Sequence, residues 1–484
     1  MFEKLNEECA VVGAIGHPEA ANLIYLALYA LQHRGQEASG IVVTDGVRMT
    51  GHKDFGLVAD VYNKNVISGL EGDCGVGHNR YSTTGASRMH QNIQPFLFNS
   101  SIGSIAIAHN GNLTNAGVLR ADMERKGSIF QSTSDTEVFM HLLARSELPD
   151  LRSRIAAVMD QVKGAYSLVL MTDSRLFAVR DPFGFRPLVL GRKNNAVIVA
   201  SESCALDLIG ASTEREIQPG EVVEIDRTGR VDSFFLARPV RPAFCSFEPI
   251  YFARPDSKIF NREIYGLRKS MGRVLAREAP VEADVVIAVP DSGVPMALGY
   301  SEQSGIPHEL GLIRNHYVGR TFIEPSQSIR DFGVKLKLNP IESVLAGRRV
   351  VVVDDSIVRG TTSVKIIRMI RKAGAKEIHM RVGSPPITHS CFFGVDTPER
   401  DQLMAAQHHI DEIRNIIGAD SLGFLSIEGL REALGVTREI DHFCYGCFTG
   451  QYPEDVGREV PEQPTDATGG PGLVSYRYGD SARP

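Results

Sequence analysis

The sequence predicts two domains: an α+β domain in the first half, followed by an α/β domain with a parallel sheet. A chain of 484 residues is too long for a single core. Up to about residue 235 short β-like runs dominate, whereas from residue 284 onward strands are followed by a turn and a helix. Residues 238–258 are irregular and rich in proline, which is typical of a domain junction. We therefore predict domains at 9–237 and 238–452, and a disordered tail at 453–484, which is rich in Pro, Gly, Asp and Ser.

Composition and charge exclude several classes of protein. The net charge is −6, so no overall basic surface argues for a nucleic-acid partner. No apolar run reaches the roughly 18 residues that a membrane span needs. Residues 1–8 are acidic and lack the features of a secretory signal, so the sequence predicts a cytoplasmic protein with no membrane partner. Seven cysteines do not make a disulfide scaffold in a chain of this length, and the cytosol would keep them reduced.

The first domain is predicted from short apolar runs rich in β-branched residues. Helices are predicted only where apolar residues repeat at helical spacing, over Ala20–Leu31 and Thr136–Arg145. The predicted strands are Val11–Ile15, Ile41–Thr44, Ile105–His109, Tyr166–Thr172, Leu188–Gly191, Val197–Ser201 and Val222–Ile225.

The second domain is predicted from two strand–turn–helix units. Their elements are the strand Asp284–Val289, the turn 290–293 and the helix Pro295–Ser304, then the strand Val350–Asp355 and the helix Val364–Ala373. Four consecutive valines in the second strand indicate burial on both faces, as in a parallel sheet, and Gly374 ends the second helix. Between the units lies the polar, basic segment 316–340, whose length predicts a lid or a disordered stretch.

Carboxyl and hydroxyl groups follow the second of these strands. Asp354 and Asp355 end the strand, and Gly360, Thr361 and Thr362 form the turn before the helix. Ligands bind at the carboxyl ends of strands in α/β sheets. Backbone N–H groups at a helix start suit a phosphate, and the two carboxylates suit ribose hydroxyls and a hard cation. No Gly-Lys-Ser/Thr ends the loop, so the nucleotide P-loop pattern is not met. The segment resembles the loop of phosphoribosyltransferases that binds phosphoribosyl pyrophosphate (PRPP).

Polar motifs in the first domain lie at the ends of predicted elements, where binding groups are common. They are Gln32-His33-Arg34-Gly35, His78-Asn79-Arg80-Tyr81-Ser82-Thr83, His109-Asn110-Gly111-Asn112 and Ser134-Asp135-Thr136-Glu137. In this order, and with Cys9 before the first strand, they resemble the N-terminal-nucleophile glutaminase domain of the amidotransferases. The resemblance implies an αββα sandwich. Taken alone, Cys9 would be a buried structural thiol, and we interpret the three histidines as structural.

The resemblance implies a site that hydrolyses glutamine. Cys9 would become the first residue once the propeptide 1–8 is removed, and its α-amine, which titrates at about 7.7–8.0, would accept the thiol proton. The side chain of Asn110 and the N–H of Gly111 would form the oxyanion hole. The implied glutamine contacts are Arg80 to the α-carboxylate and Asp135 to the α-ammonium group, with Arg34 and Thr83 as further contacts. Ala10 stands where the family often has glycine.

Two further motifs extend the resemblance over residues 9 to about 452. Pro290-Asp291-Ser292-Gly293 ends its strand as a pyrophosphate loop would, and Tyr317–Phe322 lies between it and the PRPP loop. This order is similar to that of the glutamine PRPP amidotransferases, in which ammonia displaces pyrophosphate from C1 of PRPP to give 5-phosphoribosylamine. The resemblance implies that PRPP is bound by Asp354, Asp355, Ser356, Arg359, Gly360, Thr361 and Thr362, and Mg²⁺ by Ser292, Asp354 and Asp355. It also implies that segment 316–340 closes over PRPP, that purine nucleotides act as feedback inhibitors, and that the protein is a homotetramer.

Four cysteines suggest a metal centre. Cys245, Cys391, Cys444 and Cys447 include one Cys-x-x-Cys pair, which alone is equally compatible with zinc or a redox dithiol. Four thiolates without histidine suit an iron–sulfur cluster or structural zinc. One branch of the family carries a [4Fe–4S] cluster with this arrangement, so the resemblance favours a structural cluster. Cys74 and Cys204 are expected to be buried small residues.

Two other functions compete with this prediction. A hexosamine-phosphate synthase would share the glutaminase half, but it would need sugar-isomerase domains, and the PRPP loop argues against it. A regulatory protein that senses PRPP and binds DNA could retain the loop. Such a regulator would not need a complete glutaminase, and the sequence shows no basic helix-turn-helix segment.

Overall fold

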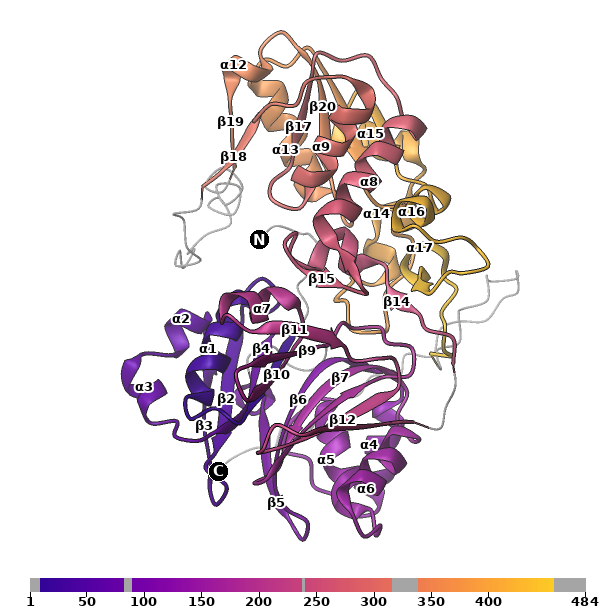
Figure 1. Cartoon of the computed structure of the whole chain (residues 1–484). Helices are drawn as coiled ribbons and strands as arrows, with labels where there is room; N and C mark the ends of the chain where they lie inside the picture. Colours follow the sequence, from indigo (N-terminus) through magenta and orange to yellow (C-terminus); the bar gives the residue numbers. More distant parts are fainter. Residues whose placement is uncertain (1–8, 82–88, 237–239, 316–337, 457–484) are drawn as a thin grey trace, which may run out of the picture.

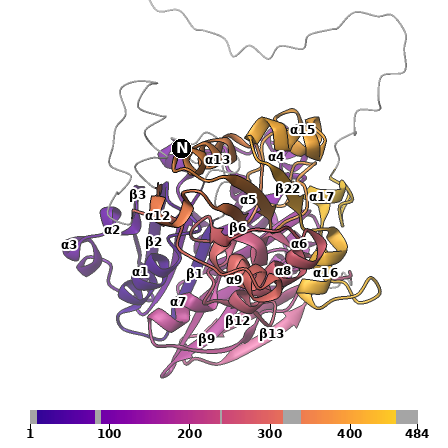
Figure 2. The same cartoon turned by 90° about the horizontal axis from the view of Figure 1, so that it is seen from above.

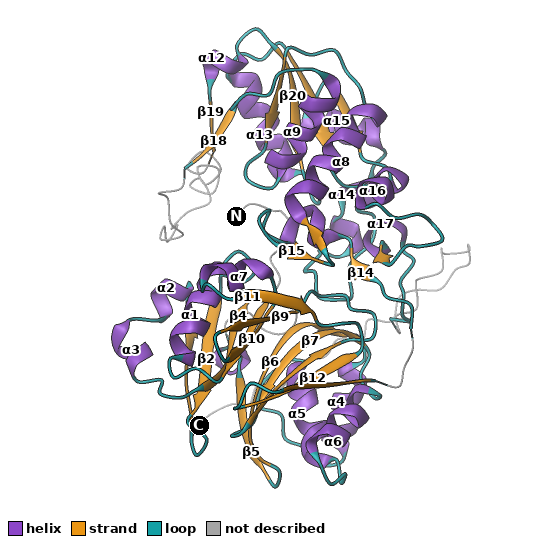
Figure 3. Cartoon of the chain, viewed as in Figure 1, coloured by secondary structure: helices purple, strands orange, loops and turns teal. Residues whose placement is uncertain are grey.

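The computed structural model describes residues 9–81, 89–236, 240–315 and 338–456. In these residues two domains lie one above the other (Figure 1): strands up to Phe235 belong to the first, and the chain from Phe244 onward belongs to the second. Figure 3 shows that strands dominate the first domain, whereas helices surround the strands of the second.

Two antiparallel sheets form the first domain. One has seven strands in the order β11 (Ser212–Glu216), β9 (Val189–Lys193), β10 (Ala196–Ala200), β1 (Ala10–Ile15), β4 (Cys74–Arg80), β2 (Ala38–Thr44) and β3 (Met49–Phe55). The other has six, in the order β13 (Val231–Phe235), β12 (Glu221–Asp226), β8 (Arg175–Arg180), β7 (Gly164–Met171), β6 (Gly103–Leu113) and β5 (Phe96–Ser100).

The two sheets pack face to face, and helices cover both outer faces. Along β1, Val11 and Ile15 point into the core between the sheets, whereas Val12 and Ala14 contact the helical layer, so every residue of this strand is buried. The first sheet is covered by α1 (Ala20–Ala30), α2 (Val58–Val61) and α7 (Ser203–Leu208), and the second by α4 (Ala116–Arg125), α5 (Thr136–Arg145) and α6 (Leu151–Met159). The predicted αββα sandwich is confirmed.

The second domain contains the predicted parallel sheet. Its strands are β17 (Val285–Ala288), β20 (Arg349–Asp354), β21 (Glu377–Val382) and β22 (Ser421–Phe424), in that order, and all three pairings are parallel. One face is covered by α8 (Ile264–Glu278), α9 (Gly293–Ser304) and α16 (Ile427–Leu434), and the other by α13 (Thr361–Lys372) and α15 (Ile410–Ile417). Helices on both faces explain the unbroken valine run of β20.

Smaller elements complete the second domain. These are β14 (Phe244–Cys245), a π-helical turn (Glu248–Phe252), β15 (Lys258–Ile259), β16 (Arg262–Glu263), β18 (Leu312–Arg314), β19 (Leu338–Pro340), α12 (Glu342–Leu345), α14 (Met404–Gln407), β23 (Phe443–Cys444) and α17 (Gly446–Thr449). The parallel pair β14–β23 joins the start of the domain to its C-terminal part. In both views α16 and α17 lie beside each other (Figures 1 and 2).

Several elements extend beyond the predicted bounds. Strand β6 continues to Leu113, so Asn110 and Gly111 lie within a strand and not after it, because β7 continues to pair with their backbone. Helix α13 begins at Thr361, three residues earlier than predicted, since Gly360 adopts a left-handed φ of +75° and forms the N-cap. The predicted propeptide 1–8, the motif Tyr317–Phe322 with most of the predicted lid, and residues 457–484 of the predicted tail lie outside the described residues. Among the residues that are described, no helix is long and apolar enough to cross a membrane.

The contact between α8 and α9 depends on two glycines. A Cβ at Gly272 would lie 1.9 Å from the carbonyl oxygen of Met296, and one at Gly299 would lie 2.0 Å from that of Lys269. Backbone atoms cannot yield as flexible side chains do, so we predict that Gly272→Ala lowers the free energy of unfolding by about 2 kcal/mol. The matched control is Gly266→Ala in the first turn of α8, where a Cβ would meet nothing and should stabilise the protein by about 0.5–1 kcal/mol. Urea unfolding measures both changes, and equal changes would contradict the close packing.

Candidate functional site

Cys9 is buried and immediately precedes Ala10, the first residue of β1. Only 8% of the residue is exposed. Its sulfur lies 3.4 Å from the carbonyl oxygen of Tyr81 and accepts a hydrogen bond from the Tyr81 N–H at 3.5 Å. Burial raises the pKa of the thiol to about 11, although the backbone of Tyr81 and the positive charge of Arg80 lower it. The thiol is therefore protonated at neutral pH unless a base takes its proton.

Asn110 and Gly111 present a polar strand segment on β6. Asn110 is 1% exposed, and within the described part of the chain its side-chain Nδ2 has no hydrogen-bond partner. A buried amide donor without a hydrogen-bond partner destabilises the folded state, which suggests that a ligand accepts a hydrogen bond from it. Gly111 has φ of +145°, and a Cβ there would lie 2.1 Å from the carbonyl oxygen of Ala165 on β7, so only glycine fits.

Opposite charges are buried near Cys9. Arg80 is 4% exposed, and its Nη1 atom has no partner among the residues that the structure describes. Asp135 accepts the Leu113 N–H at 2.9 Å and lies 3.6 Å from Nδ1 of His109. Burial opposes its ionisation, but His109 and the backbone N–H groups outweigh burial and hold the pKa of Asp135 below its usual value. The charge of Arg80 lowers the pKa of the Cys9 thiol and that of Asp135 raises it, although both effects are smaller than that of burial.

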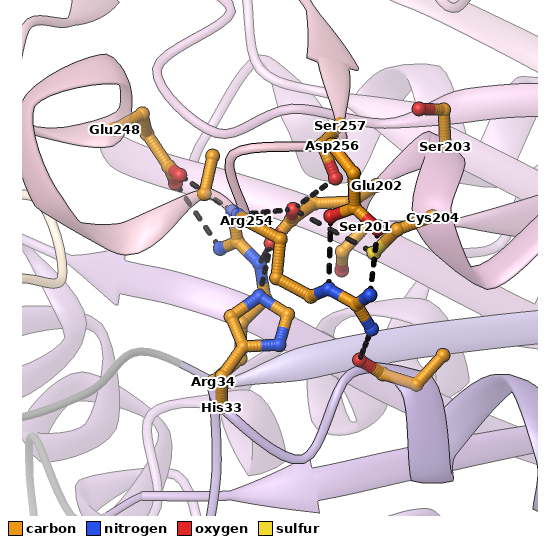
Figure 4. Close-up of polar contacts among 12 residues, drawn as sticks. His33, Arg34, Ser201, Glu202, Ser203, Cys204, Glu248, Arg254, Asp256 and Ser257 are labelled. Carbon is orange, nitrogen blue, oxygen red and sulfur yellow. Dashed lines mark hydrogen bonds and ion pairs between the residues drawn. The ribbon is translucent and has the colours of Figure 1, made fainter. Parts of the chain in front are cut away.

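Arg34 occupies a different environment from the one predicted for a glutamine contact. Its side chain is fully buried and forms ion pairs with Glu202 of the first domain and Glu248 of the second (Figure 4). Glu202 also contacts His33 and accepts hydrogen bonds from the backbone N–H of Arg254 and from Ser257. Since two carboxylates neutralise the guanidinium, the geometry favours a structural role for Arg34. Thr83, the other further contact, lies outside the described residues.

Asp354 and Asp355 lie at the carboxyl end of β20, as the sequence predicts. The hydroxyls of Ser292 and Ser356 donate to the two carboxylate oxygens of Asp355, the latter at 2.6 Å, and Asp354 accepts the Asp355 N–H at 3.0 Å. Ser292, which caps α9, thereby connects the loops after β17 and β20. The buried guanidinium of Arg268 is stabilised by the charge of Asp355, although burial lowers the pKa of Arg268 to about 10.

The start of α13 has the backbone geometry of an anion site. Gly360 has a left-handed φ, and the N–H groups of the first turn follow it on a helix of 12 residues. Thr361 is exposed, whereas Thr362 is buried. Arg359 donates to the side-chain oxygen of Gln402 at 3.0 and 3.3 Å, so this guanidinium is held beside the turn.

The four predicted metal-ligating cysteines are brought together. Cys245, Cys391, Cys444 and Cys447 line one cavity, with Phe185, Phe393 and Tyr452 in its wall. Burial raises the pKa of Cys444 to about 12, and burial together with the other three sulfur atoms raises that of Cys447 well above its usual value. All seven cysteines lie within the described residues, and none forms a disulfide. No three His, Cys, Asp or Glu side chains of the described residues are arranged to hold a single metal ion.

Comparisons with known proteins agree with this geometry. A model of the glutamine amidotransferase domain matches residues 78–208, and a model of the phosphoribosyl transferase domain matches residues 266–382. Amidophosphoribosyltransferase 1, chloroplastic, of Arabidopsis thaliana is 56% identical over 456 residues, which cover 93% of this chain and 79% of the relative. The chain belongs to the amidophosphoribosyltransferase family. This family catalyses the glutamine-dependent first step of purine biosynthesis.

A bacterial member of the amidophosphoribosyltransferase family is similar in both sequence and structure. The Bacillus subtilis (strain 168) relative is 49% identical over 461 residues, or 94% of this chain and 96% of its own length. The solved structure of the B. subtilis glutamine PRPP amidotransferase, in complex with ADP and GMP, matches with a TM-score of 0.88 and 48% identity, covering 93% of this chain and 98% of that one. The likeness therefore extends across both domains.

Sequence reasoning missed the residues that join the two domains of this family member. Arg186 lies 3.5 Å from Glu248 and donates to the carbonyl oxygen of Phe393, and Asn112 donates to that of Phe392. Arg186 stands in the run Phe183-Gly184-Phe185-Arg186-Pro187, where an arginine among aromatic residues indicates burial. Asn112 belongs to a motif that was recognised, but its partner is 280 residues away in the chain.

Removal of a carboxylate from the Arg34 cluster should destabilise the protein strongly. Glu248→Gln keeps the shape of the side chain but leaves a buried guanidinium with less compensating charge, so we expect a loss of about 3 kcal/mol in the free energy of unfolding. The control is Glu302→Gln, which removes an exposed carboxylate that pairs with Lys269 and Arg273 and should change stability little. Urea unfolding curves compare the variants, and a similar small effect of both would contradict the cluster.

Proposed function

We propose that this chain hydrolyses glutamine at Cys9 and transfers the ammonia to C1 of PRPP at the carboxyl edge of the second sheet, giving 5-phosphoribosylamine, glutamate and pyrophosphate. The observation that carries the proposal is the pair of incomplete polar sites on one chain. Asn110 and Arg80 hold buried donors in the domain that contains the buried Cys9 thiol, and the turn at Gly360 follows two carboxylates. Membership of the amidophosphoribosyltransferase family supports the coupling of the two sites.

Glutamine would complete the polar groups around Cys9. We propose that Arg80 binds its α-carboxylate, because the Nη1 atom of Arg80 has no partner among the described residues. The carboxylate of Asp135, kept ionised by its neighbours, would bind the α-ammonium group. The amide oxygen would then lie toward Asn110 and Gly111, where the tetrahedral intermediate needs hydrogen-bond donors.

Thiol activation requires a base at Cys9. The contacts of its sulfur within the described residues are backbone groups of Tyr81, and neither can accept the thiol proton as a side-chain base would. We propose that removal of residues 1–8 frees the α-amine of Cys9 for this role. The thiolate would attack the amide carbon, ammonia would leave with the proton held by the amine, and water would hydrolyse the thioester to glutamate.

PRPP would bind across the loops after β17 and β20. The 5-phosphate of PRPP would accept hydrogen bonds from the N–H groups of Gly360, Thr361 and Thr362. Asp354 and Asp355 would accept hydrogen bonds from the ribose hydroxyls. Ser356 and Arg359 adjoin this turn and complete the proposed contacts. Ser292, Asp354 and Asp355 offer hard oxygen atoms that fit Mg²⁺, which would neutralise charge on the departing pyrophosphate.

We propose that Cys245, Cys391, Cys444 and Cys447 hold a structural [4Fe–4S] cluster. An iron–sulfur cluster takes one thiolate at each iron, so it fits four sulfur atoms spaced around a cavity better than one zinc ion would. Because burial raises the pKa of Cys444 and Cys447, their thiols would release protons when the cluster binds. The cluster would join Cys245 at the domain junction to the C-terminal part of the chain.

We propose that purine nucleotides regulate the enzyme, since the B. subtilis structure is a complex with ADP and GMP. We also propose that the domains span residues 9–237 and 238–452, and that the enzyme is a homotetramer in the cytoplasm.

Two complementary variants test the proposed function. Cys9→Ala should abolish glutamine-dependent synthesis and retain synthesis from free ammonia, whereas Asp354→Ala with Asp355→Ala should abolish synthesis from either source. The assay follows glutamate and pyrophosphate with PRPP and Mg²⁺, and Cys74→Ala, another buried thiol, is the control. The mass of the mature wild-type chain should show Cys9 as the first residue. Glutamate release without PRPP-dependent pyrophosphate release in the wild-type protein would contradict the proposal.

The cysteine centre is tested by metal content. The protein purified without oxygen should absorb broadly in the visible range and contain about four iron atoms per chain. Cys447→Ser should lose both signals, and Cys204→Ser, which changes a buried thiol outside the cavity, should lose neither. Colourless wild-type protein with one zinc ion per chain would reverse the choice of metal.

A further inference from the structure

We propose that the loop Ser390–Gly394 of the second domain is a positioning element for the oxyanion hole of the first, with Gly394 and Asn112 as the positioning residues. The inference deepens the proposed function and rests on it, because it assigns an external support to the Asn110–Gly111 pair. Three contacts between the loop and the first domain carry the argument.

The first contact is a close approach of two glycines. A Cβ on Gly394 would lie 3.0 Å from both the Cα and the carbonyl carbon of Gly111, so the two backbones touch directly. Gly394 has φ of +101°, which a residue with a side chain adopts only with strain. Gly111 also lies against the Ala165 carbonyl of β7, whose oxygen would be 2.1 Å from a Cβ on Gly111. Gly111 therefore packs closely against both its own sheet and the loop of the second domain.

The second contact is a hydrogen bond on the next residue of β6. The Nδ2 atom of Asn112 donates to the carbonyl oxygen of Phe392 at 2.9 Å. Asn112 follows Gly111, so this bond fixes the strand one residue beyond the proposed oxyanion donors. No substrate contact has been assigned to Asn112, and the bond to the loop gives this amide a role.

The third contact anchors the loop itself. Arg186 donates to the carbonyl oxygen of Phe393 from Nε at 3.1 Å and from Nη2 at 2.6 Å. The Phe393 ring stacks on Phe185 with centroids 4.2 Å apart and an interplanar angle of 14°. The loop is thus held by the first domain at Phe393 as well as at Phe392 and Gly394. The loop also contains Cys391, which lines the cysteine cavity.

Such support matters because oxyanion stabilisation depends on short, aligned hydrogen bonds. Removing one donor from an oxyanion hole typically costs about 10²–10³ in kcat, and small displacements also carry large penalties. Displacement of Gly111 should therefore slow glutamine hydrolysis without weakening glutamine binding, since binding depends on Arg80 and Asp135. Transfer from free ammonia uses only the second domain and should be unaffected.

Two matched pairs of variants test this inference in the full-length protein. Gly394→Ala inserts a methyl group against Gly111, and its control Gly418→Ala has a similar φ of +78° with open space around the new Cβ. Asn112→Ser removes the bond to the loop, and its control Asn115→Ser removes a similar bond to the carbonyl oxygen of Gln161 together with one from the Lys163 N–H. We expect both test variants to lower kcat for glutamine hydrolysis by about tenfold or more, with KM and ammonia-dependent synthesis within about twofold of wild type.

A second readout does not rely on turnover. A diazoketone analogue of glutamine alkylates the Cys9 thiolate while its carbonyl occupies the place of the amide, so the rate of labelling at saturation should fall in the test variants alone. Equal losses in test and control variants, a change confined to KM, or a parallel loss of ammonia-dependent synthesis would overturn the inference. If wild-type protein made no product from ammonia and PRPP, the proposed function itself would fail.

Discussion

The arrangement of the two domains depends on a positive charge that is removed from water. Arg34 is fully buried at the junction, and a charge in that position is tolerated only where carboxylates and hydrogen bonds replace its hydration. One carboxylate, Glu202, comes from the first domain and the other, Glu248, from the second. The guanidinium therefore needs both domains in place. Separation of the domains would break the ion pair between Arg34 and Glu248.

The same junction connects the two candidate sites. Glu248 begins the π-helical turn of the second domain, and Arg268 binds the carbonyl oxygens of Pro249 and Ala253 at its two ends. Arg268 also interacts electrostatically with Asp355. Buried polar contacts thus extend from Glu202 in the glutaminase domain to the turn that Arg268 binds, and the charge of Arg268 interacts with Asp355 at the carboxyl edge of the parallel sheet.

Local patterns in the sequence predicted local structure well, whereas contacts between residues far apart in the chain could not be predicted. The valine run of β20 and the apolar spacing of α5 depend on nearby residues, so both were readable. Asn110 and Gly111 were identified from their motif, but the extension of β6 through them depends on pairing with β7. The role of Arg34 could not be derived, because its partners Glu202 and Glu248 lie 168 and 214 residues further along the chain. The contact of Gly394 with Gly111 could not be predicted either, because neither glycine has a side chain whose chemistry would indicate a partner.

The pairing of β14 with β23 can form only late in the synthesis of the chain. Ser246 donates to the carbonyl oxygen of Cys444, 198 residues further on. At about 5–20 residues per second on the ribosome, the partner of this segment emerges roughly 10 to 40 seconds later. The whole first domain is already available to fold during that interval, whereas Phe244 and Cys245 have no strand to pair with. Closure of the junction is therefore a late event, and a chain that ends before Phe443 lacks the segment needed to complete it.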